Sequence, residues 1–153
     1  MTSDTDTGAI ARAIIGSGLY MVLGTADADG NPWTSPVYYA HDGYSRFLWV
    51  SRPHREHSQN VARRPRVSIV IFNSGAAIST GQAVYMAAEA RETTDAERDE
   101  GISVFSRRSQ LHGAGAWAVD DVTGSAALRL YIATASEHWI LRPGTDDRIS
   151  VKP

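Results

Sequence analysis

The chain contains no cysteine among its 153 residues. That absence excludes disulfide bonds, thiolate metal sites and cysteine nucleophiles. Long apolar runs are also missing, since none approaches the roughly 20 residues that cross a bilayer. The polar and acidic stretch 1–7 lacks the positive and apolar parts of a secretory signal. We therefore expect a cytoplasmic protein in which residues 1–7 form a disordered leader.

A strong charge of either sign is absent as well. Fifteen basic and 17 acidic residues leave a formal net charge of −2. Such a balance creates no field that would favour nucleic acid or an anionic membrane, so neither is expected as a partner. Hydrophobic residues make up 42% and charged residues 21%, as is usual for a globular protein. The length suits one domain, which we place at residues 8–153.

Short runs of apolar, aromatic and β-branched residues dominate the rest of the chain. Pro32 and Pro36 place the second run at a sheet edge or a bulge, because proline donates no backbone hydrogen bond. Turn residues such as Asp27 to Asn31 separate the runs. Antiparallel strands in one small domain usually close into a barrel, which removes exposed edges. The predicted fold is mainly β with short helices (α+β), a six- to seven-stranded antiparallel split β-barrel. Its strands are expected near 19–25, 33–40, 47–50, 67–72, 77–92, 128–134 and 138–141, and 149–151 could add a short last strand.

Three short helices are expected between these strands. The first contains Ile10 and Ile14 at helical spacing, with Asp6 or Thr7 as its cap. The second spans about 53–63, with Ser51 as N-cap, and ends before Pro65.

The third helix has the clearest start signal. Thr94 and Glu97 have the spacing of a capping box, and the helix should run to about Arg107 with Ile102 and Phe105 facing the core. The stretch from 109 to 124 is rich in Gly, Ala and Asp, and it predicts a loop with at most one helical turn.

The most informative segment for function is the junction around Ser51. A strand ends there and a polar helix begins, so free backbone N–H groups can hold an anion. Ser51 and Ser58 offer hydroxyl groups, while Arg55 and His57 offer cationic or titratable groups. The arginine fork suits a phosphate, because it can bind two oxygens at once. This combination is typical of a phosphate clamp.

Other interpretations of the same residues stay open. A polar surface helix with a good N-cap has a similar composition. The pair His54 and His57 can also suggest a metal, but no third ligand stands at a recognisable spacing, so no metal site is expected. His112, Trp33 and Trp117 lie in or near loops, where each is either a ligand contact or an ordinary exposed side chain.

The order of these motifs resembles the pyridoxamine 5'-phosphate oxidase-like split-barrel family. It comprises a strand, a D-x-D-G turn, a strand from Trp33 to Tyr39, a strand ending in Trp49-Val50-Ser51, a short polar helix, and Arg64-Pro65-Arg66-Val67-Ser68-Ile69. Gly81 to Val84 is similar to the family strand that carries a glutamine to the flavin. The similarity covers residues 14–91 well and the remainder loosely.

The resemblance implies a homodimer that binds FMN at its interface. Val37 and Tyr38 would contact the ring or its ribityl chain, and the start of the polar helix would hold the phosphate. Gln82 would reach the flavin from the partner subunit. Trp49 is a candidate both for the cofactor site and for the core. The full candidate set for cofactor binding is Val37, Tyr38, Trp49, Val50, Ser51, Arg55, His57, Ser58 and Gln82.

Two departures from the family pattern limit the expected activity. The oxidase has an Arg-Lys pair at the helix start where this chain has Glu56 and His57, and Glu56 would repel a phosphate. The C-terminal substrate-binding set of the oxidase is also absent, so vitamin B6 oxidation is not expected. We expect a flavin-dependent oxidoreductase that takes hydride from a nicotinamide and reduces a small molecule. The alternatives are a reductase using the deazaflavin coenzyme, whose longer anionic tail would suit Arg52 and Arg63, and a flavin-binding module without its own catalysis.

Overall fold

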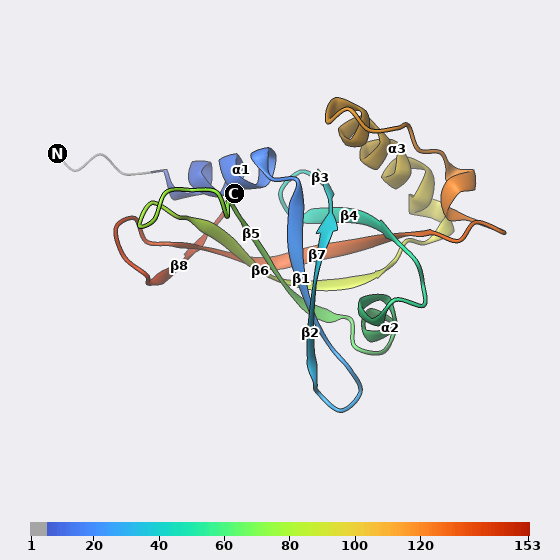
Figure 1. The fold of residues 1–153 in the computed structure, drawn as a ribbon, viewed down its shortest axis with the longest axis horizontal. Helices are drawn as coiled ribbons and strands as arrows, with labels where there is room; N and C mark the ends of the chain where they lie inside the picture. The colour runs from blue at the N-terminus through green and yellow to red at the C-terminus, as the bar shows by residue number, and fades with distance from the viewer. Residues whose placement is uncertain (1–5) are drawn as a thin grey trace.

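The computed structural model describes residues 6–153, which form three α-helices, one 3₁₀ turn and eight strands (Figure 1). Positions 1–5 of the expected leader lie outside the described residues, whereas Asp6 caps the first helix and Thr7 begins it. The elements in chain order are α1 (Thr7–Ser17), β1 (Tyr20–Ala26), β2 (Pro32–Tyr38), β3 (Ala40–Asp42), β4 (Arg46–Ser51), α2 (Glu56–Arg63), β5 (Arg66–Phe72), β6 (Ala83–Glu92), α3 (Asp95–Leu111), η1 (Val119–Val122), β7 (Arg129–Leu141) and β8 (Arg148–Val151).

All strands join one antiparallel sheet that curls on itself. The order is β2-β1-β5-β6-β7-β4-β3, and β8 pairs with β7 outside this path. Only Tyr39 separates β2 from β3, yet these two strands lie at opposite edges of the sheet. The sheet must therefore bend until its edges approach each other, which gives the predicted split barrel (Figure 1). The edge position of β2 also confirms the interpretation of Pro32 and Pro36.

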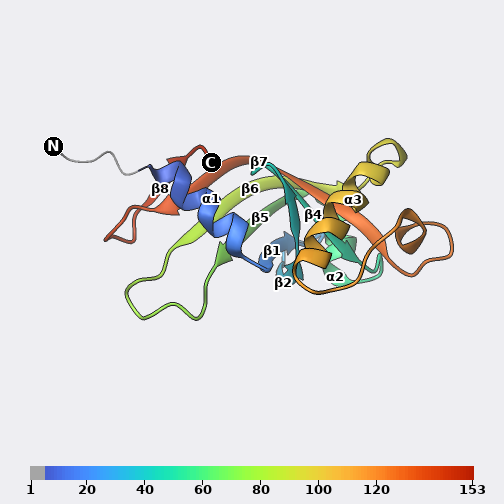
Figure 2. The ribbon, with the colours of Figure 1, turned by 90° about the horizontal axis from the view of Figure 1, so that it is seen from above.

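Two apolar clusters stabilise the curled sheet. One fills the barrel and includes Ala11 and Ile15 of α1, which is packed across β5, β6, β7 and β8. The other lies between α3 and strands β3, β4 and β7, where Ile102 and Phe105 are each 3% exposed as predicted. Viewed from above, α1 and α3 cover different parts of the sheet (Figure 2). No helix in the described part of the chain is long and apolar enough to cross a membrane.

The start of α2 differs from the prediction. Ser51 is the last residue of β4 and pairs with Arg129 of β7, so it does not cap the helix. Arg55 is the N-cap, and its side chain makes no capping hydrogen bond. Strand pairing with β7 holds Ser51 extended, and this outweighs its local preference for a cap.

Other helix and strand boundaries also differ from those predicted. The stretch 77–82 is loop rather than strand, because local bonds such as Thr80 N–H to Ala77 C=O satisfy its backbone, and Ser79 adopts a φ of 68°. The two predicted strands 128–134 and 138–141 are one strand, β7, whose pairing with β6 shifts register near Ala87. The third helix starts with the predicted capping box and continues beyond Arg107 to Leu111.

Candidate functional site

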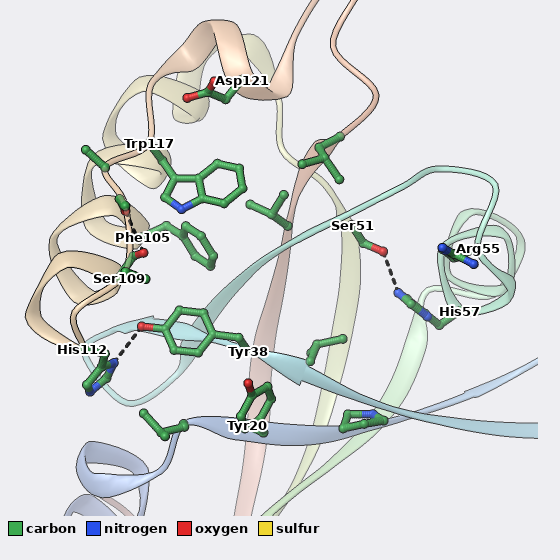
Figure 3. Close-up of a pocket in the computed structure, with 18 residues that line it drawn as sticks. Tyr20, Tyr38, Ser51, Arg55, His57, Phe105, Ser109, His112, Trp117 and Asp121 are labelled. Carbon is green, nitrogen blue, oxygen red and sulfur yellow. Dashed lines mark hydrogen bonds between the residues drawn. The ribbon is translucent and has the colours of Figure 1, made fainter.

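A pocket of about 810 Å³ lies between the ends of β2 and β4, the start of α2, and α3 with the segment that follows it (Figure 3). Such a volume is in the range of small-molecule and cofactor sites. The candidate residues that line it are Val37, Tyr38, Val50, Ser51, Arg55 and His57. Residues from both edge regions of the sheet therefore meet here, because the curl of the barrel brings β2 and β4 together.

One end of the pocket is polar. Ser51 Oγ and His57 Nε2 lie 2.9 Å apart, and Arg55 stands beside them at the N-cap of α2 (Figure 3). Burial, followed by the positive charge of Arg55, lowers the pKa of His57 below its usual value. From the sequence, we expect Glu56 to repel a phosphate. In the structure Glu56 is exposed and does not line the pocket. The chemistry of this end fits an anion such as a phosphate.

Polar contacts from α2 and from Arg64, the residue after it, hold the helix against the β1–β2 hairpin. Asn60 is 1% exposed, and its amide donates to Thr25 Oγ1 at 3.0 Å. Arg64 donates to the Ala28 carbonyl oxygen at 2.6 Å. These contacts fix the position of the helix start relative to β2. Arg55 and His57 are thereby placed by the fold rather than by a free loop.

The other end of the pocket is aromatic. The Tyr38 ring meets Phe105 edge-on at a centroid distance of 5.6 Å and Tyr20 at 6.2 Å. Trp117 meets Phe105 edge-on at 5.5 Å. Tyr38 Oη also lies 2.7 Å from His112 Nδ1. Aromatic walls of this kind suit a flat ring system.

Hydrogen bonds tie the segment after α3 to the helix. Ser106 Oγ accepts from the Trp117 N–H at 2.8 Å, and Ser109 Oγ donates to the Gly115 carbonyl oxygen at 2.8 Å. Arg108 donates to the Gly18 carbonyl oxygen at 2.7 Å and so joins α3 to the end of α1. The stretch 113–118, predicted as loop, is therefore a fixed wall of the pocket.

From the sequence, His112 and Trp117 were each either a ligand contact or an ordinary exposed side chain. Phe105 and Ser109 were not predicted as site residues. The structure places all four along the pocket. A signal was available, because Phe105, Ser109 and His112 are spaced four and three residues apart and share one face near the end of a helix. The sequence did not show what that face covers.

Three candidate residues do not line this pocket. Trp49 is fully buried and stacks on Tyr131 at 5.6 Å, so it occupies the core, one of its two expected places. Ser58 is 3% exposed within α2. Gln82 lies immediately before β6, where its amide pairs with the backbone of Leu141 at 2.7 and 2.8 Å. Its contact with a flavin held by a partner subunit stays a prediction.

A family model described as pyridoxamine 5'-phosphate oxidase matches residues 9–139. The chain therefore belongs to the pyridoxamine 5'-phosphate oxidase family. No curated protein matches the chain.

Solved structures share the fold at low sequence identity. Campylobacter jejuni ChuZ is 12% identical with a TM-score of 0.77, over 99% of this chain and 61% of that one. A heme binding protein from Mycobacterium smegmatis is 19% identical with a TM-score of 0.73, over 98% and 60%. An F420 reductase is 12% identical with a TM-score of 0.62, over 83% and 94%. At these identities the likeness concerns the fold alone.

Proposed function

We propose that the protein is an FMN-binding oxidoreductase whose pocket holds the cofactor by its phosphate. The observation that carries this proposal is the group formed by Ser51, Arg55 and His57 at the start of α2, inside a pocket with aromatic walls. Arg55 would bind two phosphate oxygens, and backbone N–H groups of the first helical turn would add donors. Membership of the family supports the same cofactor.

The rest of the pocket suits the flavin ring. Val50 and Tyr38 also line the pocket, and they would contact the ring and its ribityl chain. When bound, the flavin supplies the redox chemistry, and the chain supplies position and electrostatics. A nicotinamide would be the electron donor and a small molecule the acceptor.

The proposal includes a homodimer. The facing residues Pro36, Val22, Val70, Tyr85 and Trp139 form a row across five neighbouring strands, and each is partly or fully exposed. Such an apolar row is unusual on the surface of a monomer. Pro36 also lines the pocket, so a second copy seated on this row would reach the cofactor site.

The deazaflavin coenzyme F420 is a second candidate. The F420 reductase shares the fold, and exposed arginines stand near α2 at positions 52 and 63, where a longer anionic tail would find partners. A flavin-binding module without catalysis is the third option, and turnover of NADH or NADPH with FMN-loaded protein would remove it.

Replacing Arg55 tests the phosphate site directly. Arg55→Ala removes the charged fork and should weaken FMN binding at least tenfold, as measured by quenching of flavin fluorescence. Arg66→Ala is the matched control, because Arg66 is exposed, lies shortly after the same helix and does not line the pocket. Equal FMN affinity in both variants would contradict the assignment. Repeating the titration with F420 separates the two cofactors.

A further inference from the structure

A hydrogen-bonded pair, Tyr38 and His112, lies at the end of the pocket away from the phosphate group. Tyr38 Oη and His112 Nδ1 are 2.7 Å apart. In Figure 3 this pair and the pair of Arg55 and His57 occupy opposite ends of the cavity. A cofactor anchored by its phosphate would be held by Arg55 and His57. Tyr38 and His112 would not contact that phosphate.

The Tyr38 ring is held rigidly where it stands. Three edge-on aromatic contacts surround it: Phe105 at 5.6 Å, Tyr20 at 6.2 Å and His112 at 5.8 Å. A phenolic oxygen is one donor and also an acceptor, so the bond to His112 leaves Tyr38 a second hydrogen bond to make. That second bond is available to a molecule in the pocket, which Tyr38 lines.

His112 connects the pair to solvent. Its side chain is exposed at the C-cap of α3, whereas Tyr38 is partly buried. A histidine side chain can carry a proton between water and a hydrogen-bonded partner. Two other charged groups belong to the surroundings: Arg108 acts on Tyr38 through its charge, and Asp121 lines the same pocket. Arg108 is bound to backbone carbonyl oxygens of α1 and its following turn, and Asp121 accepts from the Ala118 N–H. The Tyr38–His112 pair is thus placed to pass protons between solvent and the pocket.

We infer that Tyr38 and His112 bind the oxygen of a hydroxylated aromatic ring and deliver a proton to it. This inference rests on the proposed function, because the ring would be the substrate beside the flavin. Flat aromatic walls favour a flat ring, and one hydrogen-bonding pair favours one ring oxygen. In the transfer, the Tyr38 hydroxyl proton moves to the ring oxyanion and the His112 Nδ1 proton moves to Tyr38 Oη. Tyr38 ends unchanged, and His112 takes a replacement proton from solvent.

The probe for this site is 4-nitrophenol, whose phenolate absorbs visible light and whose phenol form does not. Adding protein to the half-ionised probe should lower the phenolate band, because the bound probe receives a proton. Tyr38→Phe keeps the ring and should weaken probe binding about tenfold. His112→Gln keeps a hydrogen-bonding group beside Tyr38 but carries no transferable proton. In that variant the probe should bind without the loss of the phenolate band.

A control variant and one contrary outcome test the inference. His54→Gln replaces another exposed histidine, outside the pocket, and should behave as wild type. The contrary case is that the pair only stabilises the packing of α3 against β2. Tyr38→Phe and His112→Gln would then lower the free energy of unfolding but leave the probe spectrum and the probe affinity as in wild type. That result would overturn the inference.

Repeating the probe titration in the presence of saturating FMN distinguishes failure of this inference from failure of the proposed FMN site. The probe and FMN should bind together, with the probe affinity changed less than about threefold, because the FMN phosphate and the probe oxygen would bind at opposite ends of the pocket and the flavin would contact the ring of Tyr38 rather than its hydroxyl group. Mutual exclusion would overturn the inference while leaving the FMN site intact. Tyr38-dependent probe binding in a protein that retains no FMN would support the pair and refute the proposed cofactor.

Discussion

At the scale of single residues, the protonation state of His57 depends on two opposing effects. Burial and the charge of Arg55 favour its neutral form. A phosphate at the same place would favour the protonated form, because opposite charges attract. The hydrogen bond to Ser51 Oγ orients the ring in either state. His57 would therefore couple binding of the proposed phosphate to pH.

The lowered pKa of His57 predicts how stability depends on pH. Its pKa in the folded, FMN-free chain lies below the ordinary value of 6.5, so the unfolded chain binds more protons. The contribution to stability is fully present above about pH 6.5 and is lost as pH falls through the folded pKa. Thermal melts between pH 7 and pH 5 should show Tm decreasing, and less steeply in His57→Gln than in wild type.

Two other features bear on that measurement. Burial also lowers the pKa of His41 and His138, so part of the slope should persist in His57→Gln. The hydrogen bond from Arg91 lowers the pKa of Glu97 to about 2, so the contribution of Glu97 is lost only as pH falls below 4.5 and stays outside the measured window. Identical slopes in His57→Gln and wild type would show that His57 is not the half-buried, neutral group described above.

At the scale of elements, the junction between α1 and β1 depends on a close approach of the chain. A Cβ added to Gly18 would lie 2.6 Å from Tyr39 Oη and 2.9 Å from Ile71 Cγ2. Tyr39 Oη itself donates to the Ile15 carbonyl oxygen at 2.6 Å. Gly18 is therefore required for α1 to pack onto the barrel, and for Arg108 of α3 to bind the same turn.

A pair of glycine variants tests this packing. Gly18→Ala should lower the free energy of unfolding by about 1–3 kcal/mol, because the added methyl group overpacks the junction. Gly16→Ala adds the same group inside α1 where nothing lies within 4 Å, and should raise stability by up to about 1 kcal/mol. Urea denaturation measures both changes. Equal effects of the two substitutions would contradict the close approach.

The ends of the helices and strands show which structural features can be predicted from local sequence. The capping box at Thr94 predicted the start of α3 correctly, because a cap depends on residues three positions apart. The same reasoning failed at Ser51, because its conformation depends on pairing with Arg129, far away in the chain. Gln82 ends up bound to the backbone of Leu141 for the same nonlocal reason.

At the scale of the whole molecule, the pocket follows from the closure of the sheet. The strand-rich pattern and the resemblance predicted the barrel, and the residues near β2, β4 and the start of α2 predicted the polar end of the pocket. The aromatic end depends on α3 folding back over β2, as the contact of Phe105 with Tyr38 shows. No local pattern in the sequence specifies that tertiary contact, so Phe105, Ser109 and their neighbours were missed as site residues.

One gel-filtration measurement tests the central claim most directly. The protein is mixed in turn with FMN, F420 and hemin, and the absorbance spectrum of the eluted protein is recorded with its mass. The account predicts flavin bands eluting with the protein at the mass of two 16.6 kDa chains, near one FMN per chain. A protein that elutes without flavin bands, or that retains only F420 or hemin, would contradict the FMN site.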